Sequence, residues 1–226
     1  VHANNIAEHV IGMMIALARN FPGLVHAQDE QSWSIDDNRW TVRELASSRA
    51  LILGAGNIGS ALAIKALGMG MDVEVMGRNR RASFIEGVTY RTIDQLDRVL
   101  PTADHVVIGI PLTPETLNLF DDRRLARMKP GAVIYNVGRG PILNTDALVA
   151  ALQSGHLGGA GIDVSDPEPL PPGHPLWSVP NVFITGHTSG RTPYYWQRGG
   201  RILRANIAHY LANEPLENLV DYDQGY

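Results

Sequence analysis

Apolar and polar positions after residue 48 switch repeatedly between short apolar runs and helical periods. The apolar runs predict strands over 50–53, 72–76, 104–109, 132–136, 158–163 and 182–185. The segments between them predict helices over 57–68, 92–99, 121–127 and 144–154. Because most of the strands are apolar on both faces, they indicate a parallel sheet that helices cover on two sides. The pattern therefore predicts an α/β fold with a doubly wound parallel sheet.

Three further helices are predicted outside this alternating region, over 4–20, 24–31 and 193–212. Asn4 and Asn5 are candidate caps of the first helix, and Phe21-Pro22-Gly23 is expected to end it. The last helix is amphipathic, and the polar tail after it is expected to be extended.

A polar arm over residues 32–48 connects the first helices to the sheet and carries Trp33 and Trp40. Large aromatic side chains on a polar arm are typical of a surface that packs against something else. Two interpretations stay open at this point. The tryptophans pack against a second subunit in a homodimer, or they cover the core of their own chain.

The composition of the chain argues against several classes of protein. The chain has 226 residues with 44% hydrophobic content, a net charge of −4 and no cysteine. These values suit a globular protein without disulfides, and give no reason to expect nucleic acid or a metal site. The apolar stretch 10–18 is too short for a bilayer span, and no basic segment precedes it. We therefore expect a cytoplasmic protein with no membrane partner.

The run LILGAGNIGSALA, residues 51–63, places a glycine turn between a predicted strand and a predicted helix. Gly54, Gly56 and Gly59 have the G-x-G-x-x-G spacing, and Asn57 and Ile58 lie within it. Such a turn lets the backbone approach a pyrophosphate at the positive end of a helix. The motif predicts dinucleotide binding, and an ordinary tight turn is the alternative.

The end of the second predicted strand bears on the choice of nucleotide. In NAD-binding folds of this kind an acid about 20 residues after the first glycine binds the ribose 2′-hydroxyl. Here Gly77, Arg78 and Asn79 stand at that end, whereas Asp72 and Glu74 lie early in the strand and are expected to face the sheet edge or solvent. A guanidinium suits a 2′-phosphate. We therefore expect NADP(H) to be favoured over NAD(H); a solvated basic turn is the alternative.

Three chemically able residues follow successive predicted strands: Arg139, Glu168 and His187. Open α/β sheets build their sites at the carboxyl ends of strands. A protonated histidine can give a proton to a carbonyl oxygen, a carboxylate can orient its ring, and an arginine can bind a substrate carboxylate. The set therefore predicts carbonyl reduction. Taken singly, each residue is as compatible with a surface ion pair or a loop cap.

The chain resembles the D-isomer-specific 2-hydroxyacid dehydrogenase family over nearly its whole length. The motifs that carry the resemblance are NNIAEHVIGMMIALAR, GAGNIG, IPLTPETLNLF, MKPGAVIYNVGRGPILNTDAL, GIDVSDPEPLP and GHTSGRTP. The resemblance implies an oxidoreductase that transfers a hydride between NADP(H) and a small 2-ketoacid or D-2-hydroxyacid. It also implies that Arg139, Glu168 and His187 are the catalytic residues.

Further cofactor contacts are implied by the same resemblance. The aspartate near the nicotinamide carboxamide falls on Asp163, and the carbonyl that faces the nicotinamide falls on Val137. The cofactor-lining loop falls on Ile110, Pro111 and Thr116.

The motifs indicate the subfamily less clearly than they indicate the family. Gly77 stands where NAD-using members carry the ribose-binding acid, and Arg78 is similar to NADPH-preferring glyoxylate and hydroxypyruvate reductases. Gly186 and Asn144 depart from the proline and the aspartate that many members have at these positions. The resemblance extends to corepressors of the same fold, so a dinucleotide-sensing interaction protein is the alternative function.

Family members carry a flavodoxin-like substrate domain ahead of the first helix seen here, and no such domain is apparent in this chain. We therefore expect residues 1–192 to form a Rossmann dinucleotide-binding domain, with 1–48 as its first helices and dimerisation arm. Residues 193–226 would be the helix and tail that return to the substrate domain. The chain begins with Val1 rather than methionine, which suggests a fragment of a larger enzyme.

Overall fold

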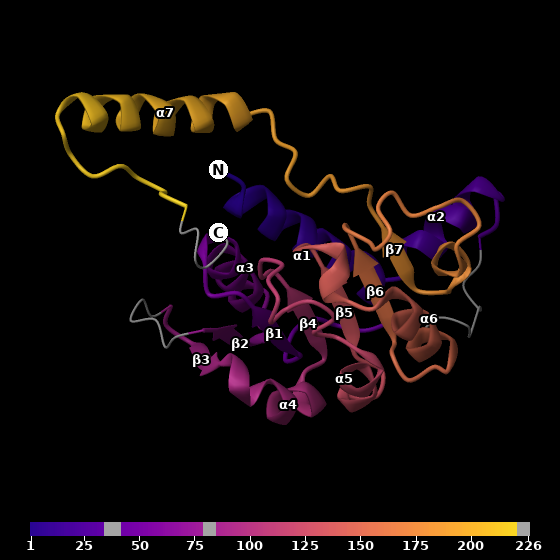
Figure 1. Cartoon of the computed structure of the whole chain (residues 1–226). Coiled ribbons are helices and arrows are strands. Elements are labelled where there is room, and N and C mark those ends of the chain that lie inside the picture. Colours follow the sequence, from indigo (N-terminus) through magenta and orange to yellow (C-terminus); the bar gives the residue numbers. More distant parts are fainter. Residues whose placement is uncertain (34–41, 79–84, 221–226) are drawn as a thin grey trace.

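The computed structural model describes residues 1–33, 42–78 and 85–220, and its centre is one parallel sheet (Figure 1). Within these residues seven strands pair in the order β3-β2-β1-β4-β5-β6-β7. The strands are β1 (Arg49–Leu53), β2 (Asp72–Gly77), β3 (Val88–Thr92), β4 (His105–Ile108), β5 (Val133–Asn136), β6 (Gly159–Ile162) and β7 (Val182–Ile184). All their pairings are parallel. The predicted fold class is confirmed. Trp40 and Asn79 lie outside the described residues.

Helices cover both faces of this sheet. The α-helices of the described residues are α1 (Ala3–Ala18), α2 (Phe21–Asp29), α3 (Asn57–Gly68), α4 (Leu96–Val99), α5 (Asp122–Arg127), α6 (Thr145–Gln153) and α7 (Tyr195–Leu211). Helices α1 and α3 pack on one face, and α4, α5 and α6 bury their apolar residues against the other. Strand β1 is apolar at successive positions because both of its faces are buried. Leu51 and Leu53 pack into one layer, and Ala50 and Ile52 pack into the other.

Strand β3 was not predicted, and it changes the surroundings of Glu74. Its sequence VTYRT alternates polar and apolar residues and is only partly buried at the sheet edge, so it lacks the continuous apolar run of the inner strands. Arg91 of β3 donates a hydrogen bond to Glu74, and Arg49 lies 3.9 Å from the same carboxylate. Glu74 therefore faces the edge strand and is buried, so the part of the expectation that placed it in solvent is wrong. Asp72 is exposed, as expected.

The first helices also differ from the prediction. Helix α1 begins at Ala3 without a side-chain cap, and the Asn5 amide instead donates a hydrogen bond to the Ser189 carbonyl at 3.0 Å. Helix α2 begins at Phe21 because a proline fits the first turn of a helix and the Asn20 side chain accepts a hydrogen bond from Gly23. Helix α1 ends at Ala18, before the run that was expected to end it, and that run forms the start of the next helix.

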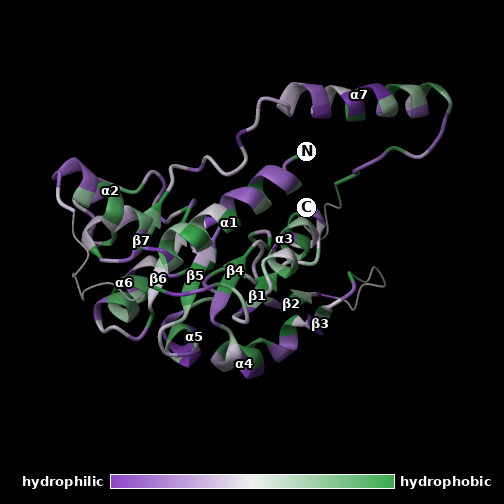
Figure 2. Cartoon of the chain, turned by 180° about the vertical axis from the view of Figure 1, so that it is seen from behind, coloured by the Kyte–Doolittle hydropathy of each residue, from purple (hydrophilic) through white to green (hydrophobic). Residues whose placement is uncertain are grey.

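Helix α7 stands away from the sheet and its covering helices (Figure 1). None of its 17 residues is buried, although Trp196, Leu203 and Ile207 are large apolar side chains. Figure 2 shows apolar residues along this helix and concentrated between the layers of the sheet domain. Trp33 is 91% exposed, so among the described residues it does not cover the core of its own chain.

Among the described residues no single helix is long and apolar enough to cross a membrane, although the bent pair α1 and α2 meets that test by length and composition alone.

The buried histidine of β4 predicts how stability depends on pH. His105 is 5% exposed, and its Nδ1 lies 3.1 Å from the Tyr135 hydroxyl. Burial lowers the pKa of His105 to about 4, against the opposing charge of Asp104 and with a further lowering by Arg43. The unfolded chain therefore binds a proton that the folded chain excludes as the pH falls from about 6.5 to 4.

We expect the free energy of unfolding to fall by about 2–3 kcal/mol through this residue between pH 7 and pH 4.5. His105→Gln keeps a polar partner for Tyr135 but has no proton to exclude, so it should lose that part of the pH dependence. Urea unfolding of both proteins at the two pH values measures the difference. Equal pH dependence in both proteins would contradict this account of His105.

Candidate active site

The glycine turn between β1 and α3 is built by close approaches that need glycine. Gly54 has φ of 120°, a conformation that L side chains rarely adopt, and a Cβ there would lie 2.6 Å from the Gly109 carbonyl oxygen. A Cβ on Gly59 would overlap the Gly54 carbonyl oxygen, so glycine lets the helix pack against the turn. Gly56 caps the helix and has open space where its Cβ would be.

This turn fits a nucleotide pyrophosphate. Asn57, Ile58 and Gly59 form the first turn of a 12-residue helix, where backbone N–H groups have no partner within the helix. The open side of Gly56 leaves room for a phosphate to approach those groups at the positive end of the helix. These residues can therefore hold the pyrophosphate of a dinucleotide.

The Gly59 packing yields a direct test. Gly59→Ala should cost about 1–3 kcal/mol of stability because the methyl group forces the helix away from β1, and it should weaken nucleotide binding. Gly68→Ala is the matched control, because it lies on the same helix with nothing within 4 Å of its Cβ. Thermal unfolding with and without NADPH measures both effects. A Gly59→Ala protein as stable as the Gly68→Ala protein would contradict the packing argument.

His187 and Glu168 form a hydrogen-bonded pair. The distance from His187 Nδ1 to Glu168 Oε1 is 2.6 Å, and both side chains are close to half exposed. His187 has φ of 53° directly after β7, and its N–H donates to the carbonyls of Asp163 and Thr185. The backbone is thus fixed in a conformation that turns the ring toward Glu168, which follows β6. The pair leaves Nε2 of the imidazole available for a substrate.

Arg139 follows β5 on the neighbouring loop. The Asn136 side chain fixes this loop, since its amide donates to the Arg139 carbonyl at 3.0 Å and its oxygen accepts from Gly138 at 3.1 Å. A Cβ on Gly140 would overlap the Ser165 carbonyl oxygen, so the loops after β5 and β6 lie against each other. The Arg139 guanidinium donates only to the adjacent Gly138 carbonyl among the described residues, at 2.8 Å.

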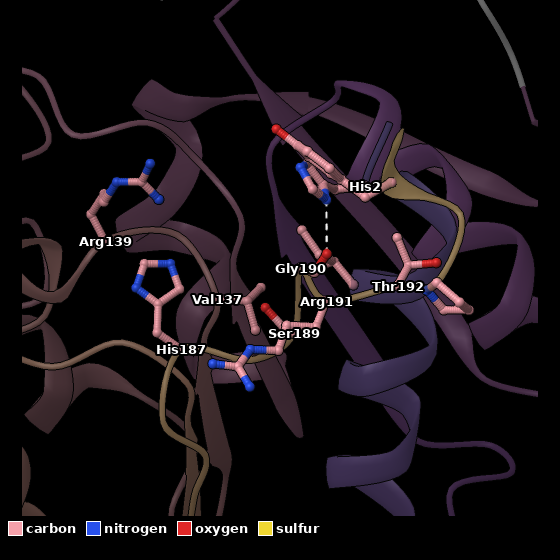
Figure 3. Close-up of a pocket in the computed structure, with 11 residues that line it drawn as sticks. His2, Val137, Arg139, His187, Ser189, Gly190, Arg191 and Thr192 are labelled. Atoms are coloured by element: carbon pink, nitrogen blue, oxygen red, sulfur yellow. Dashed lines mark hydrogen bonds between the residues drawn. The ribbon is translucent and has the colours of Figure 1, made fainter. Parts of the chain in front are cut away.

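A cavity of about 820 Å³ brings Arg139, His187 and Val137 together (Figure 3). Glu168 does not line it and acts on it only through His187. The sequence interpretation missed the remaining lining residues, which are His2, Ile6, Ser189, Gly190, Arg191, Thr192, Pro193 and Tyr195. They come from the start of the chain and from the segment after β7. Two of the motifs gave a signal that could have found some of them, since NNIAEHVIGMMIALAR contains Ile6 and GHTSGRTP contains residues 189–193.

Asp163 lies at the end of β6, but its carboxylate points into the protein. It accepts hydrogen bonds from the Thr185 hydroxyl at 2.6 Å and from the backbone N–H groups of Thr188 and Ser189. Burial raises its pKa, but these hydrogen bonds outweigh burial and hold it below the ordinary value. In this structure Asp163 braces the loop that carries His187, and a direct contact with the cofactor stays a prediction.

The loop after β4 contains the remaining expected cofactor contacts. Thr116 donates its hydroxyl to the Pro111 carbonyl at 2.8 Å and accepts from the Thr113 N–H at 2.7 Å. Thr116 therefore holds the loop closed on itself, while Ile110 packs against the core beside it. A hydrogen bond from Thr113 lowers the pKa of Glu115 on this loop, and the charge of Arg78 lowers it further. Arg78 at the end of β2 thus lies close to the loop after β4.

The family model of the D-isomer specific 2-hydroxyacid dehydrogenase NAD binding domain matches residues 11–189. The chain belongs to the D-isomer specific 2-hydroxyacid dehydrogenase family. A glyoxylate/hydroxypyruvate reductase B from Pectobacterium carotovorum is 34% identical to this dehydrogenase-family chain over 223 residues, which are 98% of this chain and 69% of that protein. This chain spans a smaller share of two other curated relatives, 64% and 58% of their lengths.

Solved structures of the dehydrogenase family share the fold over the whole chain. A D-isomer specific 2-hydroxyacid dehydrogenase from Xanthobacter autotrophicus, in complex with NADPH and MES, has a TM-score of 0.87 at 35% identity. The match covers 100% of this chain and 90% of the Xanthobacter chain. An NADPH-dependent glyoxylate/hydroxypyruvate reductase from Sinorhizobium meliloti, in complex with NADP and sulfate, has a TM-score of 0.88 at 29% identity, with coverage of 100% and 70%.

Proposed function

We propose that this protein reduces a small 2-ketoacid to a D-2-hydroxyacid with NADP(H). The observation that carries the proposal is that His187, held by Glu168 through a 2.6 Å hydrogen bond, lines one cavity together with Arg139. The three residues follow β5, β6 and β7 at the carboxyl ends of these strands. The glycine turn after β1 lies at the same edge of the sheet, so a dinucleotide bound there could reach the cavity.

Each residue has a role that its position allows. The reduced nicotinamide, when bound, supplies a hydride to the carbonyl carbon. His187 donates a proton from Nε2 to the carbonyl oxygen, so that the C=O group becomes an alcohol. Glu168 orients the ring by its hydrogen bond with Nδ1. Arg139 binds the substrate carboxylate and stabilises the negative charge that develops on the oxygen.

The preference for NADP(H) is supported by the residues at the end of β2. Position 77 is a glycine, so it has no carboxylate that could bind a ribose 2′-hydroxyl or repel a 2′-phosphate. Arg78 follows it and lies close to the loop after β4. Glu74, the acid in the middle of β2, pairs with Arg91 and Arg49. Both solved structures described above contain NADP or NADPH, which supports the same choice.

We expect NADP(H) to bind at least tenfold more tightly than NAD(H), about 1.4 kcal/mol, because Arg78 forms charge-assisted hydrogen bonds with the 2′-phosphate. The double variant Gly77→Asp with Arg78→Ala should reverse the preference. Calorimetric titration of both nucleotides into both proteins measures it. Equal affinity of the unaltered protein for the two nucleotides would contradict the role of Arg78.

Relatives named glyoxylate/hydroxypyruvate reductase support glyoxylate and hydroxypyruvate as the first substrates to test. The full-length protein should oxidise NADPH in the presence of at least one of glyoxylate, hydroxypyruvate and pyruvate, and His187→Ala should not. Failure with all three at millimolar concentration would contradict reductase activity on small 2-ketoacids. None of the relatives named above is a corepressor, so the interaction-protein alternative has no support from them.

The remaining expectations stay predictions. A homodimer is supported by Trp33, which is 91% exposed, and by the exposed apolar residues Phe21 and Leu24 on α2. A domain boundary after residue 192 is supported by α7, which buries no residue. The cytoplasmic location remains a prediction from the sequence.

A further inference from the structure

We propose that Arg191 selects 2-ketoacids that carry a second negatively charged group at the end distant from the keto carbon. The proposal deepens the proposed function and depends on it, because it names the class of substrate for the same cavity. Arg191 is exposed and lines that cavity four residues after His187.

The charge of the cavity supports a doubly charged ligand. Its eleven lining residues include two arginines, Arg139 and Arg191, and two histidines, His2 and His187, but no aspartate or glutamate. No carboxylate among the described residues lies within ion-pair distance of Arg191. Two guanidinium groups that line one cavity without an acid give it a positive charge, which a ligand with two negative groups can neutralise.

The backbone of Arg191 is held in place by the start of the chain. Its N–H donates to the Thr188 carbonyl at 2.9 Å, and its carbonyl accepts from the Asn5 side chain at 3.4 Å. His2 makes a 2.9 Å hydrogen bond with the neighbouring Gly190 carbonyl. Helix α1 therefore fixes the segment after β7, and Figure 3 shows the Arg191 side chain extending to the side of the cavity where His187 lies.

The two arginines then divide the recognition of one substrate. Arg139 lies beside His187 and binds the carboxylate next to the keto group, because that group must place its carbonyl oxygen at His187. Arg191 approaches the cavity from the segment after β7 and meets the far end of the substrate. A carboxylate or phosphate there gains charge-assisted hydrogen bonds with a guanidinium, whereas a methyl group leaves the guanidinium without a partner.

A matched pair of substrates tests this proposal in the full-length protein. With NADPH, kcat/KM for 2-ketoglutarate should exceed that for 2-ketovalerate at least tenfold, since the two differ only in a terminal carboxylate or methyl group. Arg191→Gln should lower kcat/KM for 2-ketoglutarate at least tenfold, mainly through KM, and change that for 2-ketovalerate less than twofold. Arg204→Gln, an exposed arginine of α7 outside the cavity, is the charge-matched control and should change neither.

Binding of unreactive analogues separates this proposal from the reductase activity. N-Oxalylglycine carries a terminal carboxylate, and N-ethyloxamate carries a methyl group in its place. Arg191→Gln should weaken binding of the first at least tenfold and leave the second unchanged in calorimetry with NADPH present. Equal loss for both analogues, no loss for either, or weaker NADPH binding in the variant would overturn the role of Arg191. Absence of turnover with every 2-ketoacid would instead contradict the proposed function.

Discussion

His187→Ala should lower 2-ketoacid reduction about 10³-fold, about 4 kcal/mol, because the variant has no group that can protonate the carbonyl oxygen. The affinity for NADPH should change less than twofold, since the glycine turn after β1 is separate from His187. Steady-state kinetics give the first quantity, and fluorescence titration of NADPH gives the second.

Two further variants make the His187 result specific. Glu168→Gln replaces the carboxylate that holds Nδ1 with a neutral amide, whose hydrogen bond orients the ring less strongly, so turnover should fall about tenfold to 100-fold. His26 and Glu30 form another exposed histidine–glutamate pair, 3.2 Å apart on α2, and His26→Ala should leave turnover unchanged. Unaltered turnover in His187→Ala would contradict its role as the acid.

Arg139→Ala should lower kcat/KM at least 10²-fold, about 3 kcal/mol, with effects on both kcat and KM. The guanidinium acts on the substrate carboxylate in the ground state and on the developing oxygen charge in the transition state, so neither parameter should be spared. Arg139→Lys keeps the charge but cannot form bidentate hydrogen bonds with a carboxylate. Its activity should lie between those of the alanine variant and the unaltered protein.

The control for Arg139 is Arg123→Ala. Arg123 is an exposed arginine on α5 whose guanidinium lies 3.9 Å from Asp97, and it does not line the cavity. Its loss should leave kcat and KM within twofold. A change in KM alone in Arg139→Ala would show that the residue stabilises the transition state no more than the bound substrate, which would contradict its role on the developing charge.

The sheet could be predicted from the sequence wherever burial on both faces leaves a continuous apolar run. Strand β1 and helix α3 carry both the apolar run and the glycine spacing, so their position followed from the pattern. Strand β3 did not, because an edge strand with half-exposed side chains has no such run. The burial of Glu74 was missed for the same reason, since its partner Arg91 belongs to the missed strand.

The residues of the candidate site likewise fall into those that the sequence indicated and those that it did not. Arg139, Glu168 and His187 could be predicted because each follows a recognisable strand within a motif. His2 and Tyr195 could not, since they reach the cavity only through long-range packing, in which their rings stack 5.4 Å apart. No local period marks two residues that lie 193 positions apart in the chain.

The most direct test of the account is transfer of deuterium to a 2-ketoacid by the full-length protein, from NADPH that carries deuterium at both C4 positions of the reduced nicotinamide. The account predicts a D-2-hydroxyacid with one deuterium at C2, formed in equal amount to the NADP produced, and about 10³-fold slower formation of that product by His187→Ala. An L-2-hydroxyacid, a product without deuterium, or equal product from His187→Ala would contradict it.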